Sequence, residues 1–475
     1  MSKPTTHATP AEVTAIDTQA RGPLLLLLGS GLVWLVVSGV LALLTSIQLH
    51  SPQFLADCPQ LTHGRAQALR ETAFVYGWLA NAGLGLTLWI LGRLGGSTLR
   101  GLNWVVAGTL FWNTGVALGL VGIAIGDMTS FGLLQMPRYV QPLLVFAYSC
   151  IAISGVLAWS GRREGTMYAS QWYAVAGLFL FPWLLIAAQA VLLWTPVRGV
   201  VQPIAATWYA QGVWSFWLAP LALAVAYYIV PKISGRIIPV YEWASLGFWT
   251  LLFIGSWCGG RHLVGGPVPA WIPTMAVVAQ SMMLFHYLII VLNFRAIWGV
   301  GGTTAAFIRF GFVAYLIFGI AEFIVSFRGV AAHTHFTLFN AAIEQLGLYG
   351  AISMIFFGGI YFAVPRLTGR AWSSASLIGG HRWLVLAGLV ISIAALGIAG
   401  GTQGEGLLDK NATFADILGR MGTALLINTA AQGVLLAANL LLLVNFLRSA
   451  CCFTAADSQP APTLFRPATE EAHAS

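Results

Sequence analysis

The segment Leu346–Arg366, which reads LGLYGAISMIFFGGIYFAVPR, decides the fold class of this chain. It holds no charged side chain before Arg366, its last residue. About 20 consecutive apolar residues are enough for an α-helix to cross the hydrocarbon core of a bilayer. Within that core the backbone polar groups have no water to bind, so a single spanning segment must be a helix. We therefore predict that this segment crosses a membrane as a helix.

Apolar runs of this kind recur along the whole chain. Of its 475 residues, 58% are hydrophobic and 8% are charged, whereas about a quarter of the residues in a soluble domain are charged. A disordered chain is also excluded, because it would need few hydrophobic residues and a high net charge. The pattern predicts an all-α integral membrane protein with twelve transmembrane helices, at residues 22–48, 73–95, 103–126, 139–161, 172–195, 205–230, 244–264, 270–297, 304–327, 337–363, 382–402 and 423–447.

The segments outside these spans are short and polar. We divide the chain into a polar N-terminus at residues 1–21, a twelve-helix domain at 22–447 and a flexible tail at 448–475. An even number of spans places both termini on one side, and that side carries 15 of the 23 Lys and Arg residues. By the positive-inside bias, both termini are therefore expected in the cytoplasm. The basic residues form no continuous tract, so nothing indicates binding to nucleic acid.

Seven groups of short motifs, in chain order, carry a resemblance to a known family. They are Gly64-Arg65 followed by AFVYGW at 73–78, WY at 208–209, AYYIVPK at 226–232, GGRHLVGGPVP at 259–269, THFT at 334–337, LGLYG at 346–350 and GIYFAVPR at 359–366. Together with the span count, they make the chain resemble subunit I of the haem–copper cytochrome c oxidases. The most similar branches are the cbb-type (C-family) oxidases and the related nitric oxide reductases. The resemblance implies the twelve-helix subunit I fold.

The resemblance also implies where the haem ligands of such a protein stand. Family members bind a low-spin haem through one histidine in span 2 and one in span 10, and a high-spin haem through a second histidine in span 10. Six residues before Tyr76, where the span-2 histidine belongs, this chain has Arg70. The His-x-His motif directly before LGLYG is replaced by Ile343-Glu344-Gln345, so Ile343 and Gln345 stand at haem-ligand positions.

The copper-ligand positions implied by the resemblance are changed in the same way. In the Trp-Tyr-x-His motif of span 6 the histidine is replaced by Gln211, and the His-His pair of span 7 is Arg261-His262. The tyrosine that cbb-type oxidases crosslink to a copper ligand belongs at Gly255. Five of the six metal-ligand positions thus lack an imidazole, and His262 alone keeps one.

None of the replacing side chains is a good ligand for iron or copper. A guanidinium stays protonated and has no lone pair to give, and a glutamine amide is a weak oxygen ligand for these metals. We therefore expect no catalytic residue and assign no cofactor. Haem b and copper are expected only if the family activity is retained. His333 and His335 form a His-x-His sequence that ends ten residues before the motif position. They are either displaced ligands or interfacial histidines without a metal.

Three charged residues in the spans are a further signal. Arg70, Arg261 and Glu322 are costly to bury, so each is expected to be paired or to face a cavity. The acidic partners that we consider for the two arginines are Glu71, Glu344 and Glu322. Three roles stay open for these charges: structural ion pairs, a site for a small ion or anion, and snorkelling to the membrane surface.

The sequence leaves three functions open. The first is a degenerate, haem-poor subunit with a structural, assembly or proton-path role in a respiratory terminal-oxidase-like complex, beside another oxidase subunit I or a cytochrome c-type subunit. The second is an active haem–copper oxidase or nitric oxide reductase that uses non-standard ligands to pass electrons from cytochrome c to O2 or NO. The third is an ion or small-solute transporter on the same scaffold. A bacterial inner membrane follows from the resemblance.

Overall fold

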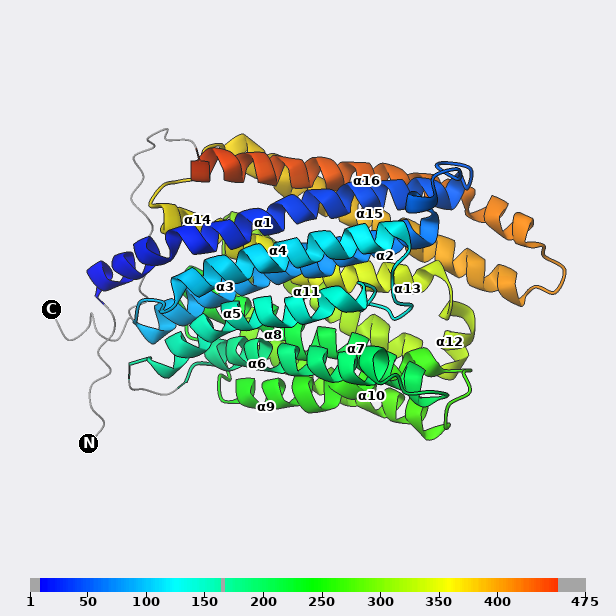
Figure 1. The fold of residues 1–475 in the computed structure, drawn as a ribbon, viewed down its shortest axis with the longest axis horizontal. Helices are drawn as coiled ribbons and strands as arrows, with labels where there is room; N and C mark the ends of the chain where they lie inside the picture. Colours follow the sequence, from blue (N-terminus) through cyan, green and yellow to red (C-terminus); the bar gives the residue numbers. More distant parts are fainter. Residues whose placement is uncertain (1–8, 164–166, 452–475) are drawn as a thin grey trace.

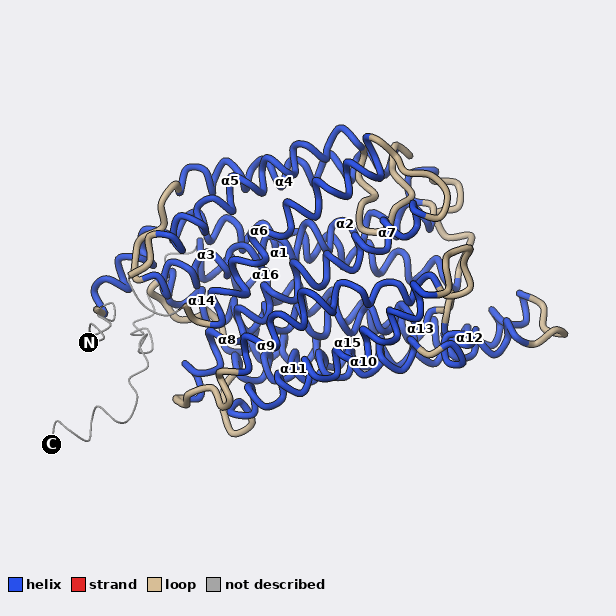
Figure 2. Tube along the Cα trace, turned by 90° about the horizontal axis from the view of Figure 1, so that it is seen from below, coloured by secondary structure: helices blue, strands red, loops and turns tan. Residues whose placement is uncertain are grey.

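The computed structural model describes residues 9–163 and 167–451, and every regular element in them is helical. The helices run along a common long axis, and α1 begins at the same end of the bundle at which α16 ends (Figure 1, Figure 2). Seven spans in the described residues are single α-helices: α1 (Pro10–His50), α4 (Leu102–Ile125), α5 (Gln141–Ser160), α10 (Trp271–Phe294), α11 (Thr303–Ser326), α15 (Ala375–Leu408) and α16 (Phe414–Cys451).

The other five spans join α-helical pieces to π- or 3₁₀-helical ones. They are α2–η2–α3 (His63–Thr72, Ala73–Leu79, Ala80–Gly95), α6–η4 (Ala169–Gln189, Ala190–Trp194), α7–η5–α8 (Val201–Gly212, Val213–Leu218, Ala219–Ser234), α9–η6–η7 (Trp243–Trp249, Thr250–Ile254, Gly255–Leu263) and α13–η9–α14 (Leu338–Gln345, Leu346–Ser353, Met354–Thr368). The connecting segments contain η1 (Pro59–Leu61), η3 (Arg138–Val140), η8 (Arg295–Ile297) and α12 (Arg328–Thr334).

The twelve predicted spans agree with this architecture. Within the described residues, eleven continuous helices are long and apolar enough to cross a membrane. The twelfth span is the broken one, Trp243–Leu263, in which an α-helix passes into a π-helix and then into a tight 3₁₀-helix. It is helical from end to end, but its α-helical part is only seven residues long.

The first span begins earlier than the sequence predicts. Helix α1 starts at Pro10, because Thr9 and Glu12 form a capping box and the proline occupies the first helical turn. Much of the predicted polar N-terminus is therefore helix, and its Asp17 is buried in an ion pair with Arg93. At the other end α16 continues to Cys451, and the rest of the predicted tail lies outside the described residues.

Wide π-helical turns occur in all five composite spans, as η2, η4, η5, η6 and η9. A π-turn holds one more residue than an α-turn, so it is rare and shifts the side chains that follow it around the axis. η2 begins three residues after Arg70, η5 two residues after Gln211, and η9 directly after Gln345, while η6 ends directly before Gly255. Four of the five π-helical segments therefore lie beside positions that the resemblance assigns to metal ligands or to the crosslinked tyrosine, and η4 is the exception.

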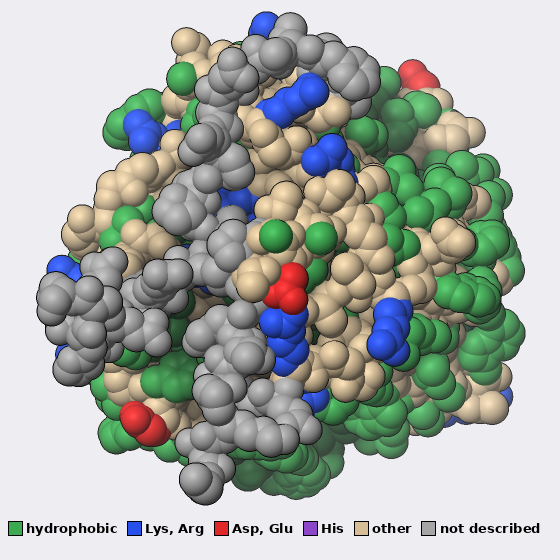
Figure 3. Space-filling model, turned by 90° about the vertical axis from the view of Figure 1, so that its left-hand side faces the viewer, with side chains coloured by type: hydrophobic (Ala, Val, Ile, Leu, Met, Phe, Trp, Pro, Cys, Tyr) green, Lys and Arg blue, Asp and Glu red, His purple; other side chains and the backbone are tan. Residues whose placement is uncertain are grey.

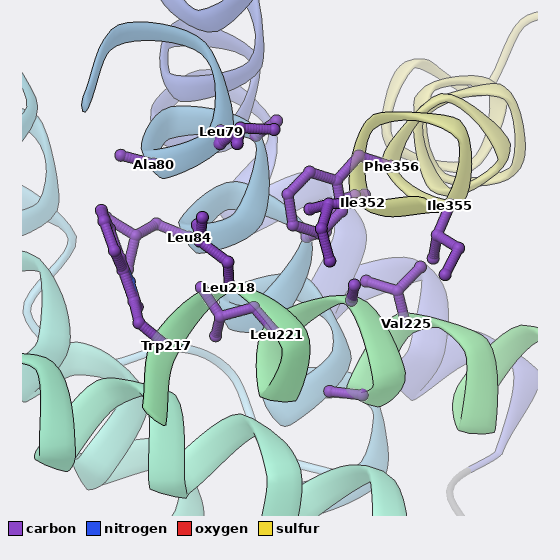
Figure 4. Close-up of a cluster of buried hydrophobic side chains, with 14 of the residues drawn as sticks. Leu79, Ala80, Leu84, Trp217, Leu218, Leu221, Val225, Ile352, Ile355 and Phe356 are labelled. Atoms are coloured by element: carbon purple, nitrogen blue, oxygen red, sulfur yellow. The ribbon is translucent and has the colours of Figure 1, made fainter. Parts of the chain in front are cut away.

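Three composite spans form the centre of the bundle. In α2–η2–α3, α7–η5–α8 and α13–η9–α14, between 89% and 94% of the most apolar 18-residue stretch is buried, against 39–50% in the eight other continuous spans. Leu84, Trp217 and Phe356, one from each of these spans, belong to the apolar cluster at their meeting point (Figure 4). Lys and Arg side chains are scattered over the end of the bundle where α1 begins (Figure 3).

Candidate functional site

Two cavities lie among the central spans. Cavity 1, of about 320 Å³, is lined by residues of α1, α2, η2, α13, η9, α15 and α16. Cavity 2, of about 380 Å³, is lined by residues of α7, η5, η6, η7, α10, α11, α13 and η9. Both volumes are in the range of small-molecule sites, and together the cavities contain most of the site positions predicted from the sequence.

Cavity 1 brings together two predicted haem-ligand positions, Arg70 and Gln345. Arg70 is half-buried, and its side chain makes no hydrogen bond or ion pair with any other described residue. It does not pair with Glu71, one of the partners considered for it. The two carboxylate oxygens of Glu71 instead accept hydrogen bonds from the amides of Gln67 and Gln135, at 2.7 and 2.8 Å.

The third predicted haem-ligand position, Ile343, lies apart from the other two. Ile343 is buried and lines neither cavity. Two residues along an α-helix correspond to a rotation of about 200°, so Ile343 and Gln345 cannot both face one cavity from α13. The α13 side chains that face cavity 2 are Asn340 and Glu344, four residues apart.

Hydrogen-bonded side-chain amides form the far wall of cavity 1. Gln345 Oε1 accepts a hydrogen bond from Ser392 Oγ at 3.2 Å, and the Gln432 amide donates to the same serine oxygen at 3.0 Å. Ser392 Oγ is also 2.6 Å from Asn428 Oδ1. These residues come from α13, α15 and α16, so the network ties the last two spans to the centre of the bundle.

Cavity 2 brings together the predicted copper-ligand positions Gln211, Arg261 and His262 and the predicted crosslink position Gly255. The Gln211 amide donates to the Gly255 carbonyl at 2.8 Å, which holds α7 against η7. Although the sequence separates Gln211 from Arg261 by a whole span and loop, the fold places them around one space.

Arg261 forms a buried ion pair with Glu322 in cavity 2. The guanidinium donates two hydrogen bonds to the carboxylate, from Nε and Nη2, each 2.5 Å long. Only 7% of Arg261 and 8% of Glu322 are exposed. Gln280 donates a third hydrogen bond to Glu322 at 3.2 Å, and Arg261 Nη1 lies 3.5 Å from Asn340 Oδ1. The two charges in the middle of the bundle therefore satisfy each other.

The two cavities share part of their walls. Glu71, Leu133, Glu344 and Leu348 line both. Glu344 is exposed into this interior space. Leu133 has a positive φ of 59°, and its carbonyl accepts a hydrogen bond from the buried Tyr76 hydroxyl. Two carboxylates thus stand at the boundary between cavities 1 and 2.

A comparison with known proteins identifies the family. Residues 23–432 match the family model described as Cytochrome C and Quinol oxidase polypeptide I. The chain belongs to this family. The resemblance predicted from the motifs is therefore confirmed.

Individual relatives support the same assignment at low identity. The chain is 23% identical over 402 residues to a cytochrome c oxidase subunit 1 homolog of Azorhizobium caulinodans, covering 78% of this chain and 70% of that one. It is 24% identical over 397 residues to the Cbb3-type cytochrome c oxidase subunit CcoN1 of Stutzerimonas stutzeri, covering 78% of this chain and 81% of that one. A solved heme-copper terminal oxidase dimer has a similar fold, with a TM-score of 0.72, 15% identity and coverage of 95% and 87%.

Haem–copper oxidases use haem and copper, so the side chains of the two cavities must be tested against these groups. His63 is the histidine that lines cavity 1, and His262 is the one that lines cavity 2. A copper ion favours several nitrogen donors, and an axial pair on haem iron needs two donors facing each other. Among the described residues, no three His, Cys, Asp or Glu side chains are grouped closely enough to hold a metal ion. The donor set does not fit either group.

The candidate displaced ligands, His333 and His335, lie outside the linings of the two cavities. His333, on α12, is exposed, and His335, directly after α12, is half-buried. Neither lines cavity 1 or cavity 2. Burial, with the positive charge of Arg261, lowers the pKa of His335 below its usual value of 6.5. His335 is thus within electrostatic range of Arg261, a predicted copper-ligand position, without lining the cavity around it.

Proposed function

We propose that this chain is a non-redox member of the subunit I family, a structural or assembly subunit of a respiratory terminal-oxidase-like complex that binds neither haem nor copper. The observation that carries the proposal is the Arg261–Glu322 pair in cavity 2. A guanidinium at this place repels a metal cation and engages the carboxylate of Glu322.

The energetics of that pair favour a structural role. Breaking a buried ion pair by removing one partner costs about 3–5 kcal/mol, because the other charge is left uncompensated. Gln280 and Asn340 complete the hydrogen bonds around the pair. The pair therefore joins η7 to α11 and replaces a metal as the link between the helices that surround cavity 2.

The proposed setting is a bacterial inner membrane with both termini in the cytoplasm. The two relatives named above are bacterial proteins described as cytochrome c oxidase subunits or homologs. The larger share of basic residues falls on the side of the termini under the predicted spans. Apart from the lipid bilayer, the proposed partner is a competent oxidase subunit I or a cytochrome c-type subunit.

The test of this proposal is the haem and metal content of the purified full-length chain. The chain is expressed with excess haem precursor and copper, beside an authentic cbb-type subunit I as positive control, and analysed by pyridine haemochrome and metal analysis. We expect haem and copper far below one per chain. Stoichiometric haem b and copper would establish the alternative, an active oxidase or nitric oxide reductase with non-standard ligands.

A gain-of-function variant sharpens this test. Arg70→His with Gln345→His places two imidazoles in cavity 1, both from positions that line it. We expect this double variant to acquire haem absorbance that the wild type lacks. Arg70→His alone is the matched control, because it supplies a single axial ligand. Equal absorbance of wild type and double variant would show that cavity 1 does not respond to the added imidazoles.

A second candidate function, ion or proton conduction, is favoured by the wall that the two cavities share. Glu71 and Glu344 line both, and a charge within a membrane span commonly marks an ion pathway. Proteoliposomes with an internal pH dye test it. If the chain conducts protons, Glu344→Gln should reduce the flux severalfold, while Glu405→Gln, at an exposed carboxylate, should leave it unchanged. Wild-type flux equal to that of empty vesicles would exclude this function.

A further inference from the structure

A second cluster of charges lies far from the two cavities, at the end of the bundle where α1 begins. It is built on three aromatic rings in mutual contact: Trp89 of α3, Tyr228 of α8 and Phe362 of α14. Trp89 meets the other two edge-on, with centroid distances of 5.3 Å to Tyr228 and 6.0 Å to Phe362. Tyr228 and Phe362 are 6.5 Å apart. The rings form one apolar platform contributed by three helices.

Each ring of this platform carries a cation on its face. Arg93 lies 4.8 Å from the Trp89 ring, Lys232 lies 4.9 Å from the Tyr228 ring, and Arg366 lies 3.5 Å from the Phe362 ring. A cation within about 6 Å of a ring centroid is attracted by the ring quadrupole. Three basic side chains, each from near the C-terminal end of a different helix, therefore meet at this platform.

One carboxylate neutralises part of this charge. Asp17 accepts a hydrogen bond from Trp89 at 2.9 Å and one from Arg93 Nε at 2.8 Å, and it also contacts Arg93 Nη2. Both oxygens of Asp17 are thus engaged by Arg93 and Trp89. Within the described residues, Asp17 is the one carboxylate that forms an ion pair in this cluster.

Arg366 and Arg21 add positive charge beside that pair. Arg366 Nη1 donates to the Phe362 carbonyl at 2.7 Å, and Arg21 Nε donates to the Leu367 carbonyl at 2.6 Å, so the two guanidinium groups are bound to adjacent parts of α14. Arg366 Nε is buried and has no hydrogen-bond partner among the described residues. A buried donor without an acceptor costs free energy, which an added acceptor would recover.

The helix ends compensate only part of the excess. Three arginines against one aspartate leave two positive charges. The C-termini of α3, α8 and α14 each act as about half a negative charge. About half a positive charge remains at the end of the spans, where a lipid headgroup would sit.

From this balance we infer that the cluster is a binding site for a phosphate group, most naturally that of an anionic phospholipid. Guanidinium groups bind phosphate through parallel hydrogen bonds, and basic pockets between spanning helices bind anionic headgroups. Arg366 supplies a donor without a partner among the described residues, Arg21 adds positive charge, and the Asp17–Arg93 pair holds α1 against α3. This inference does not depend on whether the chain binds haem.

The test measures phospholipid binding to the full-length chain. Delipidated protein is placed in nanodiscs of phosphatidylcholine or of an equal mixture with phosphatidylglycerol, and lipid retained per chain is measured by native mass spectrometry. We expect one phosphatidylglycerol to stay bound to the wild type. Arg366→Gln should weaken its apparent affinity about tenfold, as expected for the loss of a charge-assisted hydrogen bond, and Arg366→Lys should weaken it less.

The control is Arg309→Gln, a half-buried arginine of α11 that donates to the Val300 carbonyl and contacts none of the three rings. It should leave the affinity unchanged, and a single symmetric elution peak for each variant shows that it is folded. Displacement of the lipid by inorganic phosphate at low concentration would identify free phosphate as the ligand. No retained phosphatidylglycerol and no phosphate binding, or equal loss in Arg309→Gln and Arg366→Gln, would overturn the inference.

Discussion

Cavities 1 and 2 have similar volumes and share part of their walls, but the arginine in each has a different environment. Within the described residues, the arginine of cavity 2 is in an ion pair, whereas that of cavity 1 is not. In cavity 2, Arg261 is locked to Glu322 by two hydrogen bonds of 2.5 Å. In cavity 1, Arg70 has no ion-pair partner among the described residues, and the nearby Glu71 is held by two glutamines instead. Under the proposed function, this contrast means that the lost imidazoles can be replaced either by a buried ion pair or by polar side chains that hydrogen-bond one another.

The largest effect is expected from removing one partner in cavity 2. Arg261→Leu leaves Glu322 as a buried, uncompensated charge, which should lower the free energy of unfolding by about 3–5 kcal/mol. The measurement is reversible or apparent unfolding of the purified protein in detergent, followed by tryptophan fluorescence.

The matched control removes both charges. Arg261→Leu with Glu322→Leu should recover much of the stability lost in the single variant, because no unpaired charge is left. If the loss of stability in the double variant equalled the sum of the losses in Arg261→Leu and Glu322→Leu, the two residues would not be coupled. That result would contradict the contrast between the two cavities.

A moderate effect is expected where α15 supports the wall of cavity 1. A Cβ on Gly400 would lie 2.0 Å from the backbone nitrogen of Phe339, on the helix that carries Gln345. Gly400→Ala should therefore lower the unfolding temperature and cost about 1–3 kcal/mol through forced backbone movement. Gly401→Ala is the control, because a Cβ there meets no atom within 4 Å. Equal stability of the two variants would show that α15 is not packed this closely.

A small effect is expected at Arg70. Since this side chain is half-buried and has no ion pair in the described residues, Arg70→Gln should change the free energy of unfolding by no more than about 1 kcal/mol. The same unfolding assay compares it directly with Arg261→Leu. A loss as large as that of Arg261→Leu would mean that Arg70 is held by a strong interaction and that cavities 1 and 2 are alike.

The smallest effect is a pH dependence at His335, beside Arg261. Its pKa in the folded protein is lowered by burial and by that arginine, so below pH 6.5 the unfolded chain binds the proton more readily. Stability from this group is thus lost as the pH falls through 6.5. His335→Gln should flatten the decline in unfolding temperature between pH 7 and pH 5, whereas His333→Gln, at an exposed histidine, should not. Identical profiles for wild type and His335→Gln would contradict this account.

The fold was predictable from the sequence because its signal is repeated. Twelve apolar runs and seven groups of motifs each point to the same bundle, so a boundary error in one run changes little. The start of α1 was missed because hydropathy does not detect a helix that begins with the capping box of Thr9 and Glu12 and buries Asp17 against Arg93. That ion pair joins residues 76 positions apart, which no local pattern reveals.

The site was predicted in part. The copper-ligand positions meet around cavity 2, because each lies within a motif that fixes its register on a helix. Ile343 and Gln345 are both placed by their distance from LGLYG, and the helical period puts them on different sides of α13, with Gln345 alone lining cavity 1. Asn340 and Glu344 have the i, i+4 spacing of one helix face, which is the signal that could have identified them. The hydrogen bonds of Glu71 with Gln67 and Gln135 depend on tertiary packing.

An experimental structure of the chain, purified from cells supplied with excess haem precursor and copper, tests the central claim most directly. The proposal predicts continuous density joining Arg261 to Glu322 and no tetrapyrrole in cavity 1 or cavity 2. Planar tetrapyrrole density in either cavity, or a copper peak beside His262 with Arg261 turned away from Glu322, would contradict it.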